Sequence, residues 1–270
     1  MKTFKNKVVV ITGAGSGMGR AYAMAFARLG AKLALNDYDR EALGQSVALL
    51  PEPARSDCFH QAFDVADETA FAAFAAAVKQ SLGNAHVIIN NAGIEGAVKP
   101  IWAISKSEIE RVMAVNFYGV VNGTRLFLPQ LFANGEGAVI NVSSVFGLIG
   151  TPSNSDYCAS KFAVRGYTEA LMVELQDSPV DAYLVHPGGI ATNIVKKREG
   201  QAFNRKFLTT APEDIVEVVI RAVLGKRPRI VFGNQAFSIR LASGLLPLKL
   251  RNWILWRKMR DVLDGAHYPS

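Results

Sequence analysis

Cysteine is scarce in this sequence of 270 residues, in which only Cys58 and Cys158 occur. Two cysteines are too few for a disulfide framework, so we expect a reducing, cytoplasmic setting. Long apolar runs are absent as well, because no stretch reaches the roughly 18 uninterrupted apolar residues of a membrane span. The first residues contain no long apolar run before a small-residue cleavage site, so we expect no secretory signal.

Metal-ligand spacing is also missing. The four histidines, His60, His86, His186 and His267, show no pattern such as HxxxH. Histidines without such spacing are more often structural or exposed than metal ligands. We therefore predict no catalytic metal.

Acidic residues are sparse in the C-terminal part of the chain. From Lys196 onward there are fifteen Lys and Arg against six Asp and Glu, a net charge of +9, whereas residues 1–195 carry a net charge of −2. No interleaved basic and aromatic recognition motif accompanies this excess, so we expect no nucleic-acid partner. An anionic membrane surface and an acidic substrate both remain compatible with the basic charge.

What the sequence does contain is an alternation of short apolar, β-branched runs with Ala-rich amphipathic stretches. This alternation is typical of βαβ units and a parallel sheet, and a chain of this length can bury one core as a single α/β domain. We predict a doubly wound, seven-stranded parallel sheet with ligand loops at the carboxyl ends of the strands. The expected strands are Lys7–Ile11, Lys32–Leu35, 58–63, Val87–Asn90, Ala138–Val142, Ala182–Val185 and Arg229–Phe232, and the expected helices are 17–29, 39–50, Asp67–Leu82, 106–133, a helix from the Tyr157 segment to about 176, and 212–224.

The first strand is followed by a glycine-rich loop, Thr12 to Gly19, that opens a helix. Glycine permits positive φ and lets the backbone approach a pyrophosphate, while the helix N-terminus points at the anion. In this context we predict a dinucleotide-binding turn, and a flexible turn is the alternative. The predicted cofactor-binding residues of this loop are Gly13, Ser16, Gly17, Met18 and Gly19.

Asp37 ends the second expected strand. A carboxylate there can accept hydrogen bonds from an adenosine ribose and repels a 2′-phosphate. Ser16 and Tyr38 supply no cation for that phosphate, although Arg40 lies close by. We expect NAD as the preferred cofactor, with NADP not excluded.

Tyr157 and Lys161 are four residues apart in an amphipathic segment. On a helix, such a pair shares one face, so the ammonium can lie beside the phenol. A fixed positive charge favours the phenolate and lowers its pKa, which would make the tyrosine a general acid or base. Alone, this spacing also occurs by chance, and the residues around it decide its meaning.

Several motifs occur together in one order: TGAGSGMG, Asn90-Asn91-Ala92-Gly93, Asn116, Ser144, Tyr157 with Lys161, and Pro187-Gly188. Over roughly residues 5–235 the sequence resembles the short-chain dehydrogenases/reductases with TGxxxGxG and YxxxK motifs. The resemblance implies a Rossmann-type fold, a nicotinamide cofactor, alcohol/carbonyl redox chemistry, and a homodimer or homotetramer built on two long helices.

The resemblance also implies four catalytic residues. Ser144, thirteen positions before the tyrosine, would donate a hydrogen bond to the substrate oxygen. Tyr157 would take the hydroxyl proton of an alcohol. Lys161 would lower the pKa of Tyr157 and hold the nicotinamide ribose, and Asn116 would continue a water relay to Lys161.

Further cofactor contacts follow from the same resemblance. Asp64 with Val65 matches the pair that contacts adenine, although Asp64 could equally cap the next helix or turn. His86 stands where the family often has an aspartate of structural role. The remaining predicted cofactor contacts are Asn91, Ala92 and Gly93 beside Asn90, and Pro187, Gly188, Ile190 and Thr192 around the nicotinamide carboxamide.

The substrate is the least constrained feature. Residues 190–210 form either a lid over the substrate or an ordinary amphipathic surface helix. The apolar members of this segment favour a hydrophobic alcohol or ketone. They are Ile194, Val195, Phe203, Phe207 and Leu208, among the basic residues Lys196, Lys197, Arg198, Arg205 and Lys206, and further expected pocket walls are Trp102, Val145, Phe146, Leu148 and Ile149.

The chain beyond the family core is expected to form an extension, with residues 1–236 as the catalytic domain and residues 237–270 as a tail. Apolar positions from Leu248 to Leu263, among them Leu255 and Trp256, recur at helical spacing, and basic residues fall largely elsewhere. Such a basic amphipathic helix can lie on an anionic membrane surface, here through residues 240–263. It can also pack on its own subunit, cover the pocket or form an oligomer interface.

Together these features predict an NAD-preferring alcohol dehydrogenase or carbonyl reductase for an apolar secondary alcohol or ketone, of steroid-like, retinoid-like or long-chain type. Two alternatives stay open. One is a cofactor-binding regulatory protein without turnover, and the other is a peripheral membrane reductase that acts on lipid.

Overall fold

The computed structural model describes residues 1–192, 206–263 and 268. Within them one sheet of seven parallel strands runs in the order β3-β2-β1-β4-β5-β6-β7. This confirms the predicted doubly wound α/β fold. The strands are β1 (Val8–Thr12), β2 (Lys32–Asp37), β3 (Phe59–Ala62), β4 (Val87–Asn90), β5 (Gly137–Val142), β6 (Val180–Pro187) and β7 (Arg229–Phe232).

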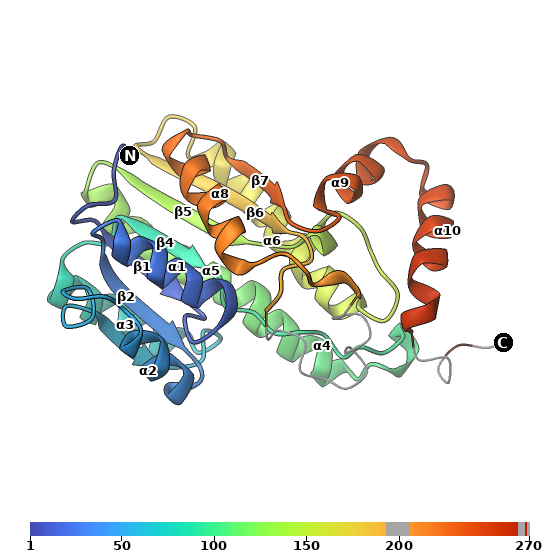
Figure 1. The fold of residues 1–270 in the computed structure, drawn as a ribbon, viewed down its shortest axis with the longest axis horizontal. Coiled ribbons are helices and arrows are strands. Elements are labelled where there is room, and N and C mark those ends of the chain that lie inside the picture. The colour runs from blue at the N-terminus through green and yellow to red at the C-terminus, as the bar shows by residue number, and fades with distance from the viewer. Residues whose placement is uncertain (193–205, 264–267, 269–270) are drawn as a thin grey trace.

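The central strands are buried on both faces, which explains their continuous apolar composition. All five residues of β1, VVVIT, are buried. One layer of helices packs on each face. Tyr22 and Phe26 of α1 (Gly17–Arg28) and Ile215 and Val219 of α8 (Pro212–Leu224) lie in the core of one face. The other face is covered by α3 (Glu68–Leu82), α5 (Gly119–Ala133) and α6 (Ser155–Glu174), while α2 (Arg40–Ala48) flanks β2 and α4 (Lys106–Met113) lies toward the carboxyl ends of the strands (Figure 1).

The expected long helix over residues 106–133 is not uniform. A wider π-helical segment, Ala114–Tyr118, separates α4 from α5. Single π turns inside helices are frequently found at functional sites. Asn116, one of the predicted catalytic residues, lies at the centre of this segment.

The C-terminal extension contains two helices instead of the one expected. They are α9 (Ala236–Leu245) and α10 (Leu248–Met259), joined at Pro247 and followed by a short 3-10 turn, Arg260–Val262. Proline cannot donate to an intrahelical hydrogen bond and favours a helix start, which explains the break. Figure 1 shows both helices beyond one end of the sheet, with α10 standing away from the sheet and the helices that cover its faces. The division at residue 236 stays a prediction.

No helix in the described part of the chain is long and apolar enough to span a membrane.

Candidate active site

A large cavity of about 970 Å³ lies where the strands end, and most of the predicted site residues line it. Among the predicted catalytic and cofactor-binding residues, only Gly19 and Asn116 do not line it. Its walls include Gly13, Ser16, Gly17, Met18, Asp37, Asp64, Val65, Asn91, Ala92, Gly93, Ser144, Tyr157, Lys161, Pro187, Gly188, Ile190 and Thr192.

The glycine loop leads into α1 and packs against the segment after β4. Gly13 has φ +67°, and a Cβ there would lie 2.8 Å from the Ala92 Cα. Gly19 serves packing, because a Cβ would lie 1.9 Å from the Gly13 carbonyl oxygen. Ser16, at the N-cap of α1, makes no side-chain capping bond, and the first turn contains no acidic residue. The amide groups of this turn are therefore suited to an anion such as a pyrophosphate.

The loop is fixed to the segment after β4 by hydrogen bonds. The Thr12 hydroxyl accepts from the amides of Asn91 and Ala92, both at 3.1 Å. The Asn91 side chain donates to the carbonyl oxygen of Thr12 at 3.0 Å. These bonds hold the loop and the Asn91–Gly93 segment as neighbouring cavity walls.

Asp37 points its carboxylate at the same loop. One oxygen accepts from the Gly15 amide at 2.7 Å, and the other accepts from the Asp39 amide at 2.9 Å. The charge is thus fixed where an adenosine ribose would lie in a dinucleotide site. Arg40, the nearby cation considered from the sequence, is exposed and does not line the cavity.

Asp64 was expected either to contact adenine or to cap the next helix or turn, and its position is compatible with an adenine contact and with a role in a turn. Its carboxylate accepts from the Ala66 amide at 3.0 Å and forms an ion pair with Arg111 at 2.7 Å. It therefore stabilises a turn, while Asp67 caps α3 by accepting from the Ala70 amide. Asp64 and buried Val65 both face the cavity.

Ser144, Tyr157 and Lys161 form the polar centre of the cavity. Ser144 follows β5, and its Oγ accepts from the Phe146 amide at 3.1 Å and also interacts with the Tyr157 phenol. Lys161 is 2% exposed; its ammonium donates to the Val142 carbonyl at 3.0 Å and lies 5.7 Å from the centre of the Tyr157 ring. Ser143 lines the cavity too, but its hydroxyl is used in a 2.8 Å bond to the Lys161 carbonyl.

The pKa of Tyr157 is raised in the structure, whereas the sequence led us to expect a lowered pKa. Burial raises it to about 12, and the hydrogen bond with Ser144 lowers it only in part. Burial also lowers the pKa of Lys161 to about 8. Desolvation disfavours the charged form of both groups, and spacing along a helix does not reveal it. The phenol is therefore neutral at physiological pH in this structure, ready to donate a proton.

Asn116 supports the site from outside the cavity. Fully buried, its side chain accepts from the Ile94 amide at 2.8 Å and donates to the Ile94 carbonyl and the Ser160 hydroxyl. The amide is thus occupied by protein contacts that join α6 to the segment after β4. The water relay to Lys161 stays a prediction.

Residues 187–192, at the end of β6 and just after it, are held by backbone bridges to two later parts of the chain. Ile190 bridges Thr210, and Gly189 bridges Asn234. The Asn234 side chain donates to the Phe207 carbonyl at 3.0 Å. These contacts fix Pro187 to Thr192 against the glycine loop, where a Cβ at Gly17 would lie 3.0 Å from Thr192.

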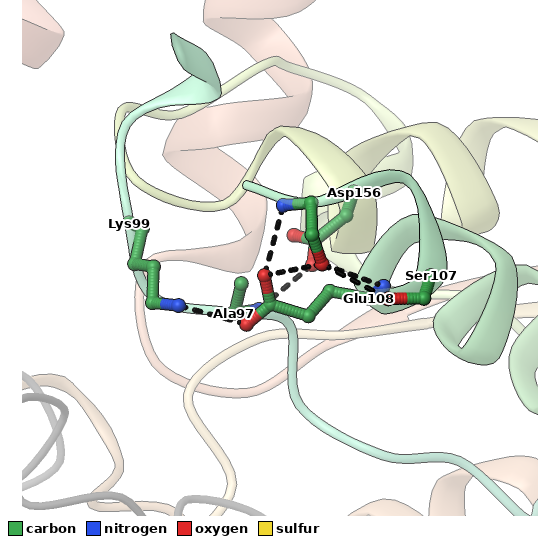
Figure 2. A network of polar contacts seen from close by, with 6 residues as sticks. Ala97, Lys99, Ser107, Glu108 and Asp156 are labelled. Atoms are coloured by element: carbon green, nitrogen blue, oxygen red, sulfur yellow. Dashed lines mark hydrogen bonds and ion pairs between the residues drawn. The ribbon is translucent and has the colours of Figure 1, made fainter. Parts of the chain in front are cut away.

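One functional neighbour was missed from the sequence. Asp156, directly before Tyr157, is 2% exposed and accepts from the Ala97 amide at 2.7 Å and from the Tyr157 amide at 2.8 Å. Figure 2 shows its carboxylate beside Ala97, and the same view contains the ion pair of Lys99 with Glu108 at 2.8 Å. That ion pair and the Ser105 cap lower the pKa of Glu108 to about 2. These contacts hold the cavity wall over residues 95–98.

The expected substrate walls are partly right. Val145, Phe146 and Ile149 line the cavity, as do Phe207 and Leu208. Trp102 does not, because its ring is 67% exposed and packs on Tyr268, and Leu148 is buried away from the cavity. Ile194, Val195, Phe203 and most of their basic neighbours lie outside the described residues.

The C-terminal helices line part of the cavity, in agreement with one of the roles left open from the sequence, that of covering the pocket. Leu255 lines it together with Arg251 and Lys258 of the same helix face. The apolar side chains of α10 do not have the cavity to themselves, since Arg251 and Lys258 also line it and Trp256 is 42% exposed. The cavity-lining residues of the extension are Ser238, Ile239, Ala242, Leu246, Arg251, Ile254, Leu255, Lys258, Met259, Val262 and Leu263.

Two of the histidines that the structure describes, His86 and His186, make contacts with the backbone. His86 accepts from the Val8 amide at 3.2 Å, far from the cavity in the register of β1 and β4. His186 is fully buried, and its Nδ1 lies 2.8 Å from the Ser144 carbonyl. Burial lowers its pKa to about 4. No group of three metal-ligating side chains occurs among the described residues, and the absence of a catalytic metal stays a prediction.

Comparisons with known proteins agree with this geometry. A family model described as short chain dehydrogenase matches residues 7–202. SadH of Mycobacterium tuberculosis is 39% identical over 264 residues, which cover 91% of this chain and 93% of SadH. Levodione reductase of Leifsonia aquatica is 34% identical over 228 residues, covering 84% of this chain and 85% of that protein.

Solved structures give the same result. The crystal structure of levodione reductase has a TM-score of 0.80 at 30% identity, covering 90% of this chain and 99% of that chain. A short-chain dehydrogenase/reductase from Burkholderia phymatum in complex with NAD has a TM-score of 0.78 at 32% identity, covering 85% of this chain and 90% of that chain. The chain therefore belongs to the short-chain dehydrogenase/reductase family of oxidoreductases.

Proposed function

We propose that the protein is an NAD-preferring alcohol dehydrogenase or carbonyl reductase that acts on an apolar secondary alcohol or ketone. The observation that carries this proposal is one cavity lined by Ser144, Tyr157 and Lys161 together with the glycine loop and Asp37. A proton carrier and a dinucleotide site are thereby adjacent, as hydride chemistry requires.

The residues present fit a nicotinamide dinucleotide. The uncapped first turn of α1 would hold the pyrophosphate, and Asp37 would accept from the adenosine ribose. Asp64 and Val65 border the space for adenine, and Lys161 would hold the nicotinamide ribose. When bound, the nicotinamide accepts or donates the hydride. Asn91, Ala92, Gly93, Pro187, Gly188, Ile190 and Thr192 would border its ring.

Tyr157 moves the proton in this proposal. In the reductive direction its phenol donates the proton to the carbonyl oxygen while Ser144 donates a hydrogen bond to the same oxygen. The raised pKa of Tyr157 keeps that proton in place at neutral pH. In the oxidative direction Tyr157 must first lose its own proton before it accepts that of the alcohol.

An apolar substrate is supported by the walls beyond Tyr157. Phe146, Ile149 and Leu208 face residues such as Ile254 and Leu255 of the extension around one cavity. Apolar surfaces of this kind bind hydrophobic ligands by removing both surfaces from water. The similarity to levodione reductase supports a carbonyl substrate.

The test is a panel of steroid, retinoid, aliphatic and aryl alcohols and ketones, assayed with NAD and NADP by nicotinamide absorbance. Turnover with NAD on apolar members is expected. A protein that binds NAD but turns over no member of the panel would favour the non-catalytic regulatory alternative.

A specific observation favours peripheral membrane contact as a second property. Phe237, Leu245, Leu248 and Trp253 of the extension are 54% to 75% exposed, and Arg257 stacks 4.6 Å from the Trp253 ring. Exposed apolar and basic side chains together suit an anionic lipid surface. The triple variant Phe237→Ser, Leu245→Ser, Trp253→Ser should lose salt-sensitive sedimentation with anionic vesicles, and unchanged sedimentation would reject this contact.

We also propose a cytoplasmic homodimer or homotetramer built on α5 and α6. Val173 and Phe162 of α6 are 75% and 40% exposed, which is compatible with a covered surface in an oligomer. Light scattering coupled to gel filtration gives the mass directly. A monomer at micromolar concentration would contradict this proposal.

A further inference from the structure

Arg251 is a cation in the wall of the cavity, and one of its nitrogens lacks a hydrogen-bond partner among the described residues. It lies in α10, is only partly exposed, and lines the cavity wall opposite the family motifs. Its Nε is buried and has no hydrogen-bond partner among the described residues. A buried guanidinium nitrogen without a partner is costly and calls for an explanation.

Three other charged groups around the cavity have partners. Arg111 pairs with Asp64, Glu108 pairs with Lys99, and the buried ammonium of Lys161 donates to a backbone carbonyl. Each of these contacts explains why that group is where it is. Arg251 has no such explanation within the protein contacts described.

The surroundings of Arg251 are apolar. Ile254 and Leu255 follow it by three and four residues, so all three share one face of α10, and all three line the cavity. Lys258, one further turn along, lines the cavity on the same face. The result is a hydrophobic wall with a guanidinium set in it and a second cation beside it.

We propose that Arg251 binds an anionic oxygen group, a carboxylate or a phosphate, at one end of an apolar substrate whose alcohol or ketone lies at Tyr157. This inference rests on the proposed function and specifies its substrate class. A guanidinium presents a planar fork of N–H donors that matches two oxygens of such a group. The apolar walls of the cavity then accommodate the substrate between its two polar ends.

The experiment compares substrates that share one carbon skeleton and differ only in the group at one end. A fatty acid with a secondary hydroxyl near its methyl end is compared with its methyl ester, with the matching phosphate ester, and with the plain secondary alkanol. KM and kcat are measured with NAD for the wild type and Arg251→Gln. Arg257→Gln is the matched control, because this arginine of the same helix stacks on Trp253 and does not line the cavity.

For the wild type, KM for an anionic substrate, the fatty acid or the phosphate ester, is expected to be about tenfold or more lower than KM for the methyl ester. Hydrogen bonds to charged groups are worth about 1.5–3 kcal/mol. Arg251→Gln should raise KM for that member by a similar factor and leave KM for the ester and the alkanol within twofold. Arg257→Gln should change neither. Whichever of the carboxylate and the phosphate shows the larger loss identifies the group.

Two results overturn the inference. Equal KM for charged and neutral members in the wild type would do so, and so would an Arg251→Gln effect of equal size on all members, which indicates a structural role. Arg251→Lys keeps the charge and should retain part of the preference for the anionic substrate. This control separates the loss of an anion contact from misfolding. Failure of the proposed function is distinct, because then no member is turned over by any variant.

Discussion

Lys161 holds its ammonium 3.0 Å from the carbonyl oxygen of Val142, at the end of β5, and 5.7 Å from the centre of the Tyr157 ring. The ammonium is thus fixed by the sheet and lies under the face of the tyrosine. Burial of this cation lowers its pKa to about 8. The same burial has a cost in stability, which leads to the first prediction.

Lys161→Met should stabilise the protein without cofactor at pH 7. The folded pKa of about 8 lies below the unfolded value of 10.5, so between these two values the unfolded chain binds more protons and the wild type gains stability as the pH rises. At pH 7 the penalty is up to about 3 kcal/mol. Urea unfolding at pH 7 and 9.5 should show this rise in the wild type and a smaller rise in the variant; parallel curves would contradict it.

Asp37 should set the preference for NAD. Asp37→Asn removes the charge and keeps an acceptor for the Gly15 amide, which Asp37 now binds at 2.7 Å. Relief of repulsion should shift the ratio of kcat/KM values toward NADP by about tenfold, since a charge contact is worth roughly 1–3 kcal/mol. Glu41→Gln, on the exposed first turn of α2, is the control and should leave the ratio unchanged. An unaltered ratio in Asp37→Asn would argue against this role.

His186, in its neutral form, should hold the backbone of Ser144 in place by a hydrogen bond. Since a carbonyl only accepts, Nδ1 carries the proton that is donated to the Ser144 carbonyl at 2.8 Å. The folded pKa of about 4 lies below the unfolded 6.5, so this contribution to stability is complete above pH 6.5 and is lost as the pH falls toward 4. His186→Asn keeps a donor without titrating and should flatten the stability loss between pH 6.5 and 4.5. His186→Leu should also lower kcat, and equal activity of both variants would separate His186 from catalysis.

Tyr268 should hold the extension closed over the cavity. Its hydroxyl lies 2.7 Å from the Ser153 hydroxyl, and its ring packs at 5.7 Å on Trp102 and 5.4 Å on Trp256. Each aromatic pair contributes about 0.5–1.5 kcal/mol. Tyr268→Ala should therefore raise KM for an apolar ketone about fivefold or more and leave KM for NAD unchanged, because the glycine loop is remote. Tyr268→Phe keeps the ring contacts and should have a smaller effect; equal effects would assign closure to the hydroxyl.

Local geometry explains what the sequence predicted well. The loop from Thr12 to Gly19 and the Asp37 carboxylate each follow a buried parallel strand, so their position at the carboxyl edge is set by the chain itself. Ser144, Tyr157 and Lys161 also converge as expected, because one follows β5 and the other two share a face of α6.

Tertiary packing explains what the sequence did not predict. Asp156 holds Ala97, which is 59 residues away, and no spacing rule connects them. The inward face of α10 depends on how that helix docks, so spacing along the chain did not place Arg251 at the cavity. The direction of the Tyr157 pKa depends on burial, which exceeds the influence expected from Lys161 four residues on.

The central claim is that Tyr157 carries the proton in nicotinamide-dependent redox chemistry within this cavity. The most direct measurement is the rate of NADH oxidation with the best apolar ketone of the panel, for the wild type and Tyr157→Phe, with NADH affinity measured by fluorescence in both. The account predicts a loss in kcat of about 10²–10⁴ with NADH affinity within a few-fold of the wild type. Equal turnover by Tyr157→Phe would contradict it.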